Sequence, residues 1–374
     1  MKNSKDFIAE RLNARRLEGS FRSLSSKNNS IDFCSNDYLG FARSKELKEQ
    51  IETAFIEFPD APIGSTGSRL ISGNSIFLEN LEKEIAQFHE AESGLIFNSG
   101  YDANLGLFSS LPQKCDTVIT DELIHASVID GIRLSHANRY SFKHNDLNSL
   151  EQKLKAAAGK TYIAVESIYS MDGDEAPLQE IAELADKYQT ALIVDEAHAT
   201  GIFGENGRGL VAANNLQDKV FARIITFGKA LGVHGAIVLG CDTLREYLIN
   251  FSRPFIYSTA SAFHSYLSVK CAYKFLQQQN HQKILKEKID LFKEQTQSIS
   301  NRFIKSNSPV QCLVIPGNNE ARRVAEILQH KNFNVRPILH PTVAKGKERL
   351  RICLHTFNSD EEIKQLAHHL KENL

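Results

Sequence analysis

The chain has 374 residues, of which 42% are hydrophobic and 24% are charged. This length exceeds one small core and predicts about two domains in a soluble globular protein. Lysine and arginine number 44 against 45 aspartates and glutamates, which leaves a formal charge of -1 at pH 7. That balance argues against a protein that wraps a polyanion such as a nucleic acid.

The amino-terminal residues MKNSKDFIAERLNARR are typical of an amphipathic helix rather than of a secretory signal peptide. No stretch of the chain approaches the ~20 apolar residues that cross a bilayer. The six cysteines are scattered, form no C-x-x-C pair and show no spacing typical of a metal site. We therefore expect a cytoplasmic protein with no metal centre and with reduced cysteines in its core.

Apolar, β-rich segments alternate with helical patterns over the first 240 residues. Their hydrophobicity is continuous rather than alternating, as strands covered on both faces require. The predicted fold class is therefore α/β, with a mainly parallel sheet flanked by helices. The predicted strands are residues 94–100, 117–121, 161–167, 191–198, 223–229 and 235–240.

Two of the intervening helices are well marked in the sequence. Residues 74–89 place Leu78, Leu81, Ile85 and Phe88 on one apolar stripe. Pro177 opens a second helical pattern over 177–188.

The alternation of predicted strands and helices stops at about residue 260, and long helices are predicted over roughly 261–306. Two strands, VQCLVIPG and RLRICLH, then surround a helix that begins near Asn319, and Ser359 with Glu362 forms a capping box for a last helix. These patterns predict a smaller α+β domain. We expect an amino-terminal helix and arm, a large α/β domain and a carboxy-terminal α+β domain with linking helices, at residues 1–41, 42–260 and 261–374. A serine- and asparagine-rich patch at 23–30 is expected to be a loop.

Polar residues stand where several predicted strands stop, which is where an open α/β sheet binds its ligands. Asp195 and His198 end one strand, and Lys229 ends the next along the chain. One strand–connection–strand unit separates Asp195 from Lys229, so both can face one crevice. A lysine among small and apolar neighbours either snorkels to the surface or performs covalent chemistry.

This set of side chains suits pyridoxal 5'-phosphate (PLP). The cofactor needs a lysine that loses a proton to form a Schiff base, and a carboxylate that keeps the pyridine nitrogen protonated. Ser99, Gly100 and Tyr101 stand at the predicted start of a helix and suit the phosphate.

Nine segments in order over nearly the whole chain resemble the α-oxoamine synthases, PLP-dependent enzymes of fold type I. They are SNDYLG (35–40), GSTGSRLISGN (64–74), DELIHASVIDG (121–131), KHND (143–146), ESIYSMDGDEAPL (166–178), VDEAHATGIFGENGRG (194–209), TFGKALGVHGA (226–236), RPFIYST (253–259) and HPTVAKGKERLRICL (340–354). The resemblance implies the PLP-dependent transferase fold, a homodimer with active sites at its interface, and decarboxylative condensation of an amino acid with an acyl thioester.

Within the family, SNDYLG, PTV and RLRI are most similar to members of the biotin pathway that join L-alanine to a pimeloyl thioester. The carrier of that thioester is coenzyme A or an acyl carrier protein. Sister activities stay open, namely glycine with acetyl-CoA, serine with palmitoyl-CoA and glycine with succinyl-CoA, because several segments together shape an acyl pocket.

The resemblance also implies roles for individual residues. Lys229 would bind PLP covalently and serve as acid and base, and Asp195 would pair with the pyridine nitrogen. His198 would bond the ring oxygen and His125 would stack on the ring. The further cofactor contacts would be Gly100, Tyr101, Ser170, Thr226 and, across the dimer interface, Ser258 and Thr259. The substrate contacts would be Arg351 for the amino-acid carboxylate and Arg22, Asn36 and Thr342 for the acyl group.

Most of these residue types also have ordinary structural roles. An isolated serine or threonine is more typical of a turn or cap, and His125 alone is typical of a core histidine. Asp195 with His198 could cap a strand end, and Arg22 could be a solvated helix charge. The motif context favours the functional interpretation.

Two features depart from the family pattern. Leu78 stands where many relatives have a histidine, and its place on the apolar stripe predicts a core residue. The segment NNSIDFC, before SNDYLG, is shorter than the usual hairpin. The resemblance therefore does not specify how this chain binds the thioester carrier.

Two other classes of protein are disfavoured. DEAH (195–198) and GKT (159–161) suggest an ATPase, but Leu154 stands where the phosphate-binding loop needs glycine, and GKT leads from a helix into a strand. A catalytically silent scaffold is disfavoured because Lys229, Asp195, His198 and Arg351 are all present.

Overall fold

The computed structural model describes residues 4–24 and 30–374, which pack as two units. Unit 1 contains the described residues up to Ser35 together with Met171–Gly173 and Lys286–Leu374, and unit 2 contains Asn36–Ser170 and Asp174–Leu285. The predicted domain boundaries at residues 42 and 261 stay predictions. Residues 25–29 of the expected loop at 23–30 lie outside the described part of the chain.

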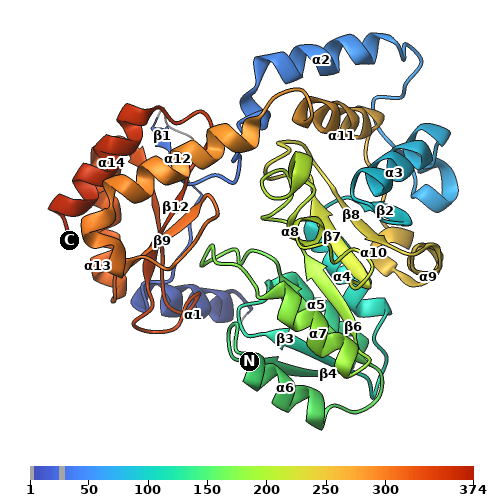
Figure 1. The fold of residues 1–374 in the computed structure, drawn as a ribbon, viewed down its shortest axis with the longest axis horizontal. Helices are drawn as coiled ribbons and strands as arrows, with labels where there is room; N and C mark the ends of the chain where they lie inside the picture. Colours follow the sequence, from blue (N-terminus) through green and yellow to red (C-terminus); the bar gives the residue numbers. More distant parts are fainter. Residues whose placement is uncertain (1–3, 25–29) are drawn as a thin grey trace. The chain divides into compact units, whose positions relative to one another are not determined.

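Unit 2 is an α/β unit built on one large sheet (Figure 1). Its strands are β2 (Ser93–Phe97), β3 (Thr117–Asp121), β4 (Asn138–Phe142), β5 (Thr161–Glu166), β6 (Ala191–Asp195), β7 (Ala222–Thr226) and β8 (Ala236–Gly240). Its helices are α2 (Lys45–Ile56), α3 (Ile76–Phe88), α4 (Gly100–Ser110), α5 (Ala126–Ser135), α6 (Leu147–Ala156), α7 (Leu178–Lys187), α8 (Leu210–Ala213), α9 (Asp242–Phe251), α10 (Arg253–Ile256) and α11 (Phe263–Leu276), with short turns η1 (Phe41–Arg43), η2 (Arg69–Gly73) and η3 (Glu205–Gly207).

The strand order of this sheet is β2-β8-β7-β6-β5-β3-β4. All neighbours from β7 to β4 pair in parallel, and β8 alone runs antiparallel to both of its neighbours. The mainly parallel sheet is therefore confirmed, with all six predicted strands in it. The sequence missed β4, an edge strand whose first four residues are exposed and which has no continuous apolar run.

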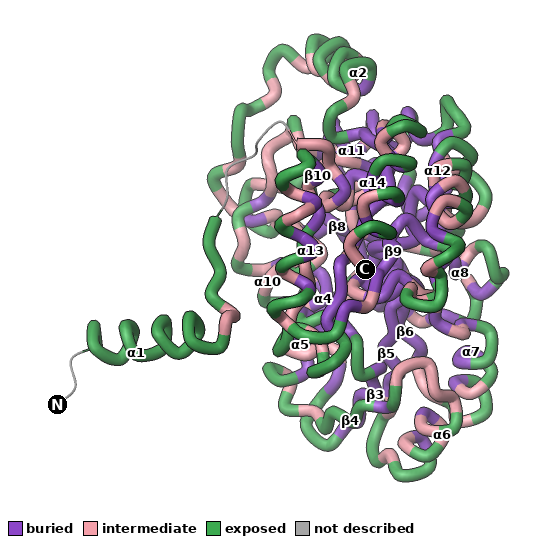
Figure 2. The backbone as a smooth tube through the Cα atoms, turned by 90° about the vertical axis from the view of Figure 1, so that its left-hand side faces the viewer, coloured by how far each residue is buried: buried purple, intermediate pink, exposed green. Residues whose placement is uncertain are grey.

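The core of unit 2 lies on both faces of the sheet. Along β5, Ile163 and Val165 pack into the cluster that includes α6 and α7, whereas Tyr162 and Ala164 pack into the cluster that includes α4 and α5. Figure 2 shows buried residues along β5 and β6. Because successive strand residues point to opposite faces, both faces must be apolar, which explains the continuous hydrophobic runs.

The predicted helix at 74–89 is α3, which begins after the cap residue Ser75. Leu78, Leu81 and Ile85 are buried, so the expected core position of Leu78 is confirmed. Pro177 precedes α7, as predicted.

Unit 1 is an α+β unit. Its elements are α1 (Ser4–Leu17), β1 (Ile31–Asp32), η4 (Gln297–Arg302), β9 (Val310–Val314), α13 (Asn318–His330), β10 (Phe333–Asn334), β11 (Arg336–Ile338), β12 (Arg349–Cys353) and α14 (Asp360–Glu372), and α12 (His281–Gln295) spans the boundary of the two units. β11, β12 and β9 form an antiparallel sheet, and β1 pairs in parallel with β10. The capping box of Ser359 and Glu362 is confirmed.

All six cysteines are free. Cys271, Cys312 and Cys353 are buried, but Cys115 is exposed in a turn at φ 82°, so the prediction of a core position is wrong for Cys115. Among the described helices, none combines the length and apolar character that spanning a bilayer requires.

Candidate functional site

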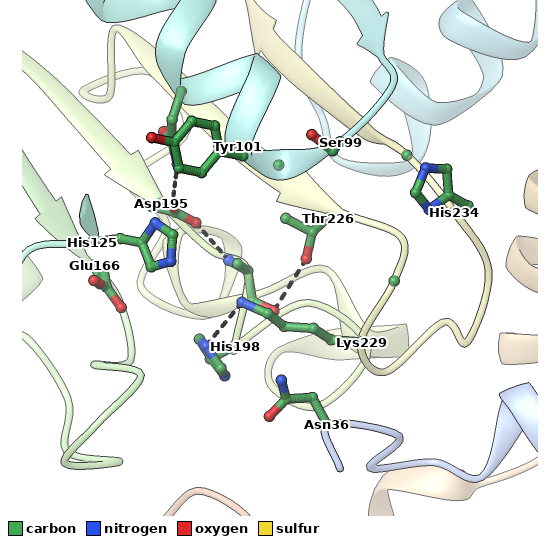
Figure 3. A pocket seen from close by; sticks show the side chains of 15 residues that line it. Asn36, Ser99, Tyr101, His125, Glu166, Asp195, His198, Thr226, Lys229 and His234 are labelled. Atoms are coloured by element: carbon green, nitrogen blue, oxygen red, sulfur yellow. Dashed lines mark hydrogen bonds between the residues drawn. The ribbon is translucent and has the colours of Figure 1, made fainter. Parts of the chain in front are cut away.

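A pocket of about 320 Å³ lies at the carboxyl ends of the parallel strands of unit 2 (Figure 3). Strands β5, β6 and β7 end at Glu166, Asp195 and Thr226, which all line it. The predicted residues that line the pocket are Asn36, Ser99, Gly100, Tyr101, His125, Asp195, His198, Thr226 and Lys229. The convergence of strand ends expected from the sequence is therefore present.

Lys229 lies on the loop between β7 and β8, with its side chain in the pocket. Its Nζ is 2.8 Å from Nε2 of His198 (Figure 3). The loop turns back at Gly232, whose φ of 66° suits glycine and whose N–H donates to the carbonyl of Lys229 at 3.0 Å. Lys229 is half-buried and follows a strand of the sheet, so it does not snorkel over an open surface.

Asp195 is buried, and its carboxylate is held by two neutral donors. Its Oδ1 accepts the N–H of Ala197 at 2.9 Å, and its Oδ2 accepts from Nδ2 of Asn104 at 2.8 Å. Sequence reasoning missed Asn104, although a polar residue on the apolar side of the helix after β2 was a usable signal. These contacts fix the direction of the carboxylate without neutralising it.

Glu166 is a second buried carboxyl beside Asp195, because the two are paired residues of neighbouring parallel strands. Its Oε2 accepts the N–H of Ser170 at 2.9 Å, and its Oε1 has no hydrogen-bond partner. Burial and the charge of Asp195 raise the pKa of Glu166 to about 8, although Lys229 opposes this. Glu166 is therefore mostly protonated at neutral pH. The sequence analysis did not single it out.

His125 caps α5, with its Nδ1 2.7 Å from the hydroxyl of Ser127. Burial lowers the pKa of His125 and nearby Lys229 adds to this, while Asp195 opposes it. The ring is therefore neutral at pH 7 and offers a flat aromatic face to the pocket.

The start of α4 forms another wall of the pocket. Ser99 caps the helix by accepting the N–H of Asp102, and Gly100 is the first helical residue. A Cβ at Gly100 would lie 2.6 Å from Cγ2 of Thr226, so glycine lets the helix start approach the end of β7 this closely. Free N–H groups of a helix start favour an anion such as a phosphate there.

The other predicted residues do not line this pocket. Ser170 is buried and meets Glu166 through its backbone. Ser258 is half-buried and Thr259 is exposed, and the carbonyl of Thr259 accepts from Nδ2 of Asn98 at 3.0 Å. Arg22, Thr342 and Arg351 belong to unit 1, where Arg22 and Thr342 are exposed and Arg351 lies half-buried on β12. The proposed roles of all these residues stay predictions.

Comparison with known proteins identifies the family. Residues 28–370 match the aminotransferase class I and II family. The 8-amino-7-oxononanoate synthase of Emericella nidulans is 41% identical over 360 residues, which cover 89% of this chain and 87% of that protein.

Two solved structures share the fold. The 8-amino-7-oxononanoate synthase of Francisella tularensis is 30% identical and superposes with a TM-score of 0.79 over 92% of this chain and 98% of its own. The serine palmitoyltransferase of Sphingomonas wittichii is 25% identical, with a TM-score of 0.87 over 98% of this chain and 96% of its own. The predicted type I fold is thus confirmed, and the chain belongs to the aminotransferase class I and II family and, within it, to the α-oxoamine synthases whose motifs it carries.

Proposed function

We propose that this chain is a PLP-dependent acyltransferase that condenses L-alanine with a pimeloyl thioester. The products are 8-amino-7-oxononanoate, carbon dioxide and the free thiol of the carrier, as a step of biotin biosynthesis. The observation that carries the proposal is the meeting of Lys229, Asp195 and His198 in one pocket, in a chain 41% identical to an 8-amino-7-oxononanoate synthase.

The pocket residues fit PLP. Asp195 is an oriented carboxylate for the pyridine nitrogen, Lys229 is the amine for covalent attachment, and the neutral ring of His125 suits stacking. The start of α4 at Ser99 and Gly100, which lines the pocket, suits the phosphate. When bound, the cofactor supplies an electron sink for the carbanion of the amino acid.

The side chains of this chain then bind, orient and move protons. Lys229 takes and returns a proton at the α-carbon of the amino acid. His198, whose Nε2 lies 2.8 Å from Nζ of Lys229, is its hydrogen-bonding neighbour. Arg351 binds the amino-acid carboxylate through its planar guanidinium. Arg22, Asn36 and Thr342 contact the acyl group.

We also propose a homodimer in which Ser258 and Thr259 reach the phosphate bound to the partner. An acyl carrier protein is a proposed alternative to coenzyme A as the carrier, and the proposed location is the cytoplasm.

The experiment incubates PLP-loaded protein with alanine, glycine or serine and with pimeloyl-, acetyl-, succinyl- or palmitoyl-CoA. Mass spectrometry then identifies the product of each pair. A product from alanine and pimeloyl-CoA alone supports the proposal. Absence of product with pimeloyl-CoA calls for the same test with the pimeloyl group on acyl carrier protein, and failure of both refutes it.

Condensation of serine with palmitoyl-CoA is the second candidate. It is favoured by the superposition on the S. wittichii serine palmitoyltransferase, which covers 98% of this chain. A product from serine and palmitoyl-CoA would keep the chemistry of Lys229 and replace the substrates.

A further inference from the structure

Tyr38, in the motif SNDYLG, contacts one nitrogen of the His198 ring, and Lys229 contacts the other. The side chain is fully buried, and its hydroxyl is 2.8 Å from Nδ1 of His198. The same hydroxyl donates to Oδ1 of Asn36 at 3.0 Å. The two rings are tilted by 53° with centroids 6.1 Å apart, so they meet through the hydroxyl rather than by stacking.

The hydrogen bonds determine which nitrogen of His198 carries the proton. A tyrosine hydroxyl has one proton, and Tyr38 gives it to Asn36. Its oxygen is therefore an acceptor toward His198, so Nδ1 must be protonated. In a neutral imidazole Nε2 is then the acceptor, which matches the 2.8 Å contact with the amine of Lys229.

The turn that carries Tyr38 is itself fixed. The N–H of Gly40, at φ 73°, donates to the carbonyl of Asp37 at 2.9 Å. The carboxylate of Asp37 accepts the N–H of Ala42 and pairs with Arg43, each at 3.1 Å. These contacts limit the freedom of Tyr38 to move away from His198.

The turn also packs against the loop of Lys229. A Cβ on Gly232 would lie 2.2 Å from the backbone nitrogen of Ala42, so the two segments approach as closely as glycine allows. Tyr38 and Lys229 are thereby held on opposite sides of one imidazole ring.

We propose that Tyr38 is a positioning residue that holds His198 in the Nδ1-protonated form and so presents an acceptor nitrogen to the pocket. Within the proposed function, Nε2 would then accept a hydrogen bond from a proton at the ring oxygen of PLP. The pH at which the absorbance of bound PLP changes should therefore depend on Tyr38. This second consequence rests on the proposed function, whereas the protonation of His198 does not.

The first test uses the cofactor-free full chain with ¹⁵N-labelled histidine. The signals of His198 are identified by their absence in His198→Gln, and the wild type should show a protonated Nδ1. In Tyr38→Phe the buried Nδ1–H loses the hydroxyl oxygen of Tyr38 as an acceptor, so the proton should shift toward Nε2 or onto both nitrogens. Unchanged ¹⁵N shifts in Tyr38→Phe would overturn the proposal.

The second test measures PLP binding and the pH dependence of the absorbance of bound PLP. Tyr38→Phe should bind PLP roughly three- to tenfold more weakly, as expected for one lost hydrogen bond, and should shift the pH midpoint. The matched control is Tyr273→Phe, which removes a hydroxyl 2.9 Å from Nε2 of the buried His89 outside the pocket. An equal shift of the pH midpoint in both variants would show that Tyr38 acts through general packing and would overturn its positioning role. If the wild type binds no PLP, the proposed function fails, but the ¹⁵N test still decides the role of Tyr38.

Discussion

Asp195 and Glu196 are neighbours in the sequence, yet their carboxylates have opposite surroundings. Glu196 is fully buried, and its Oε2 accepts from Nε and Nη2 of Arg223 at 2.9 and 2.7 Å, while its Oε1 accepts the N–H of Val211 at 2.9 Å. Arg223 also donates to the carbonyls of His89 and Arg208. We call this group the Arg223 cluster. Asp195 instead has two neutral donors and opens onto the pocket.

The carboxylate of Glu196 stabilises the fold, whereas the carboxylate of Asp195 is available to a ligand. In the Arg223 cluster, both carboxylate oxygens of Glu196 accept hydrogen bonds and the carboxylate has a cation. In the pocket, Oε1 of Glu166 and Oδ1 of Asn104 have no partner, and two carboxyls lie on neighbouring strands. Unpaired buried polar atoms cost stability, so this arrangement is expected where a bound molecule completes it.

The largest expected effect comes from removing the amine of the pocket. Lys229→Ala should lose turnover by more than about 10²–10⁴-fold, since it removes both the covalent attachment and a general acid and base. The measurement is the rate of product formation, with the unfolding temperature as a check on folding. Lys155→Ala, which changes an exposed side chain of α6, is the control and should keep its activity. Turnover within tenfold of the wild type would refute the assignment of Lys229.

The next effect tests the Arg223 cluster. Glu196→Gln keeps the shape but leaves the buried guanidinium without a counter-charge, so the free energy of unfolding should fall by about 3–5 kcal/mol. Urea denaturation of the cofactor-free chain measures it. The double variant Glu196→Gln/Arg223→Met removes both charges and should recover part of the loss. A loss below about 1 kcal/mol in the single variant would contradict the structural role of this pair.

Asp195→Asn, one residue earlier, should weaken PLP binding and leave the free energy of unfolding nearly unchanged, which is the opposite of the effect expected for Glu196→Gln. Loss of the carboxylate charge should weaken PLP binding by roughly 10–100-fold, the range for a hydrogen bond to a charged group. The free energy of unfolding should change little, because the amide of Asn104 can rotate and offer its unpartnered Oδ1 to the new amide. PLP titration and urea denaturation of one preparation give both numbers. A large loss of stability with intact PLP binding would reverse our distinction between the two acids.

One side of this contrast, the pocket, was readable in the sequence. Continuous apolar runs predicted the sheet, and the residues that end the runs predicted Asp195, His198 and Lys229 in one pocket. The two-residue period of strands is also consistent with opposite surroundings for Asp195 and Glu196. The partners could not be predicted, because Tyr38 is far from His198 along the chain, and Glu196 and Arg223 meet only once the sheet has formed. Local patterns specify elements and their ends, whereas such contacts depend on tertiary packing.

The smallest expected effect concerns Glu166, whose pKa is raised to about 8 in the folded chain. Between the ordinary glutamate pKa near 4.5 and pH 8, the folded chain holds a proton that the unfolded chain has released. Stability contributed by this group is therefore present at low pH and falls as pH rises. Glu166→Gln cannot titrate, so it should be more stable than the wild type at pH 8.5 and equally stable below pH 4.5.

Urea denaturation of the cofactor-free chain across this pH range measures the effect, with the exposed Glu52→Gln as control. A difference between Glu166→Gln and wild type that does not change with pH would show that Glu166 is ionised in the folded chain. The sign of the effect matters more than its size. The same glutamate-to-glutamine change should destabilise the Arg223 cluster at Glu196 and, at pH 8.5, stabilise the pocket at Glu166. The reason is that the first carboxylate is bonded to the guanidinium of Arg223, whereas the second is buried beside the like charge of Asp195.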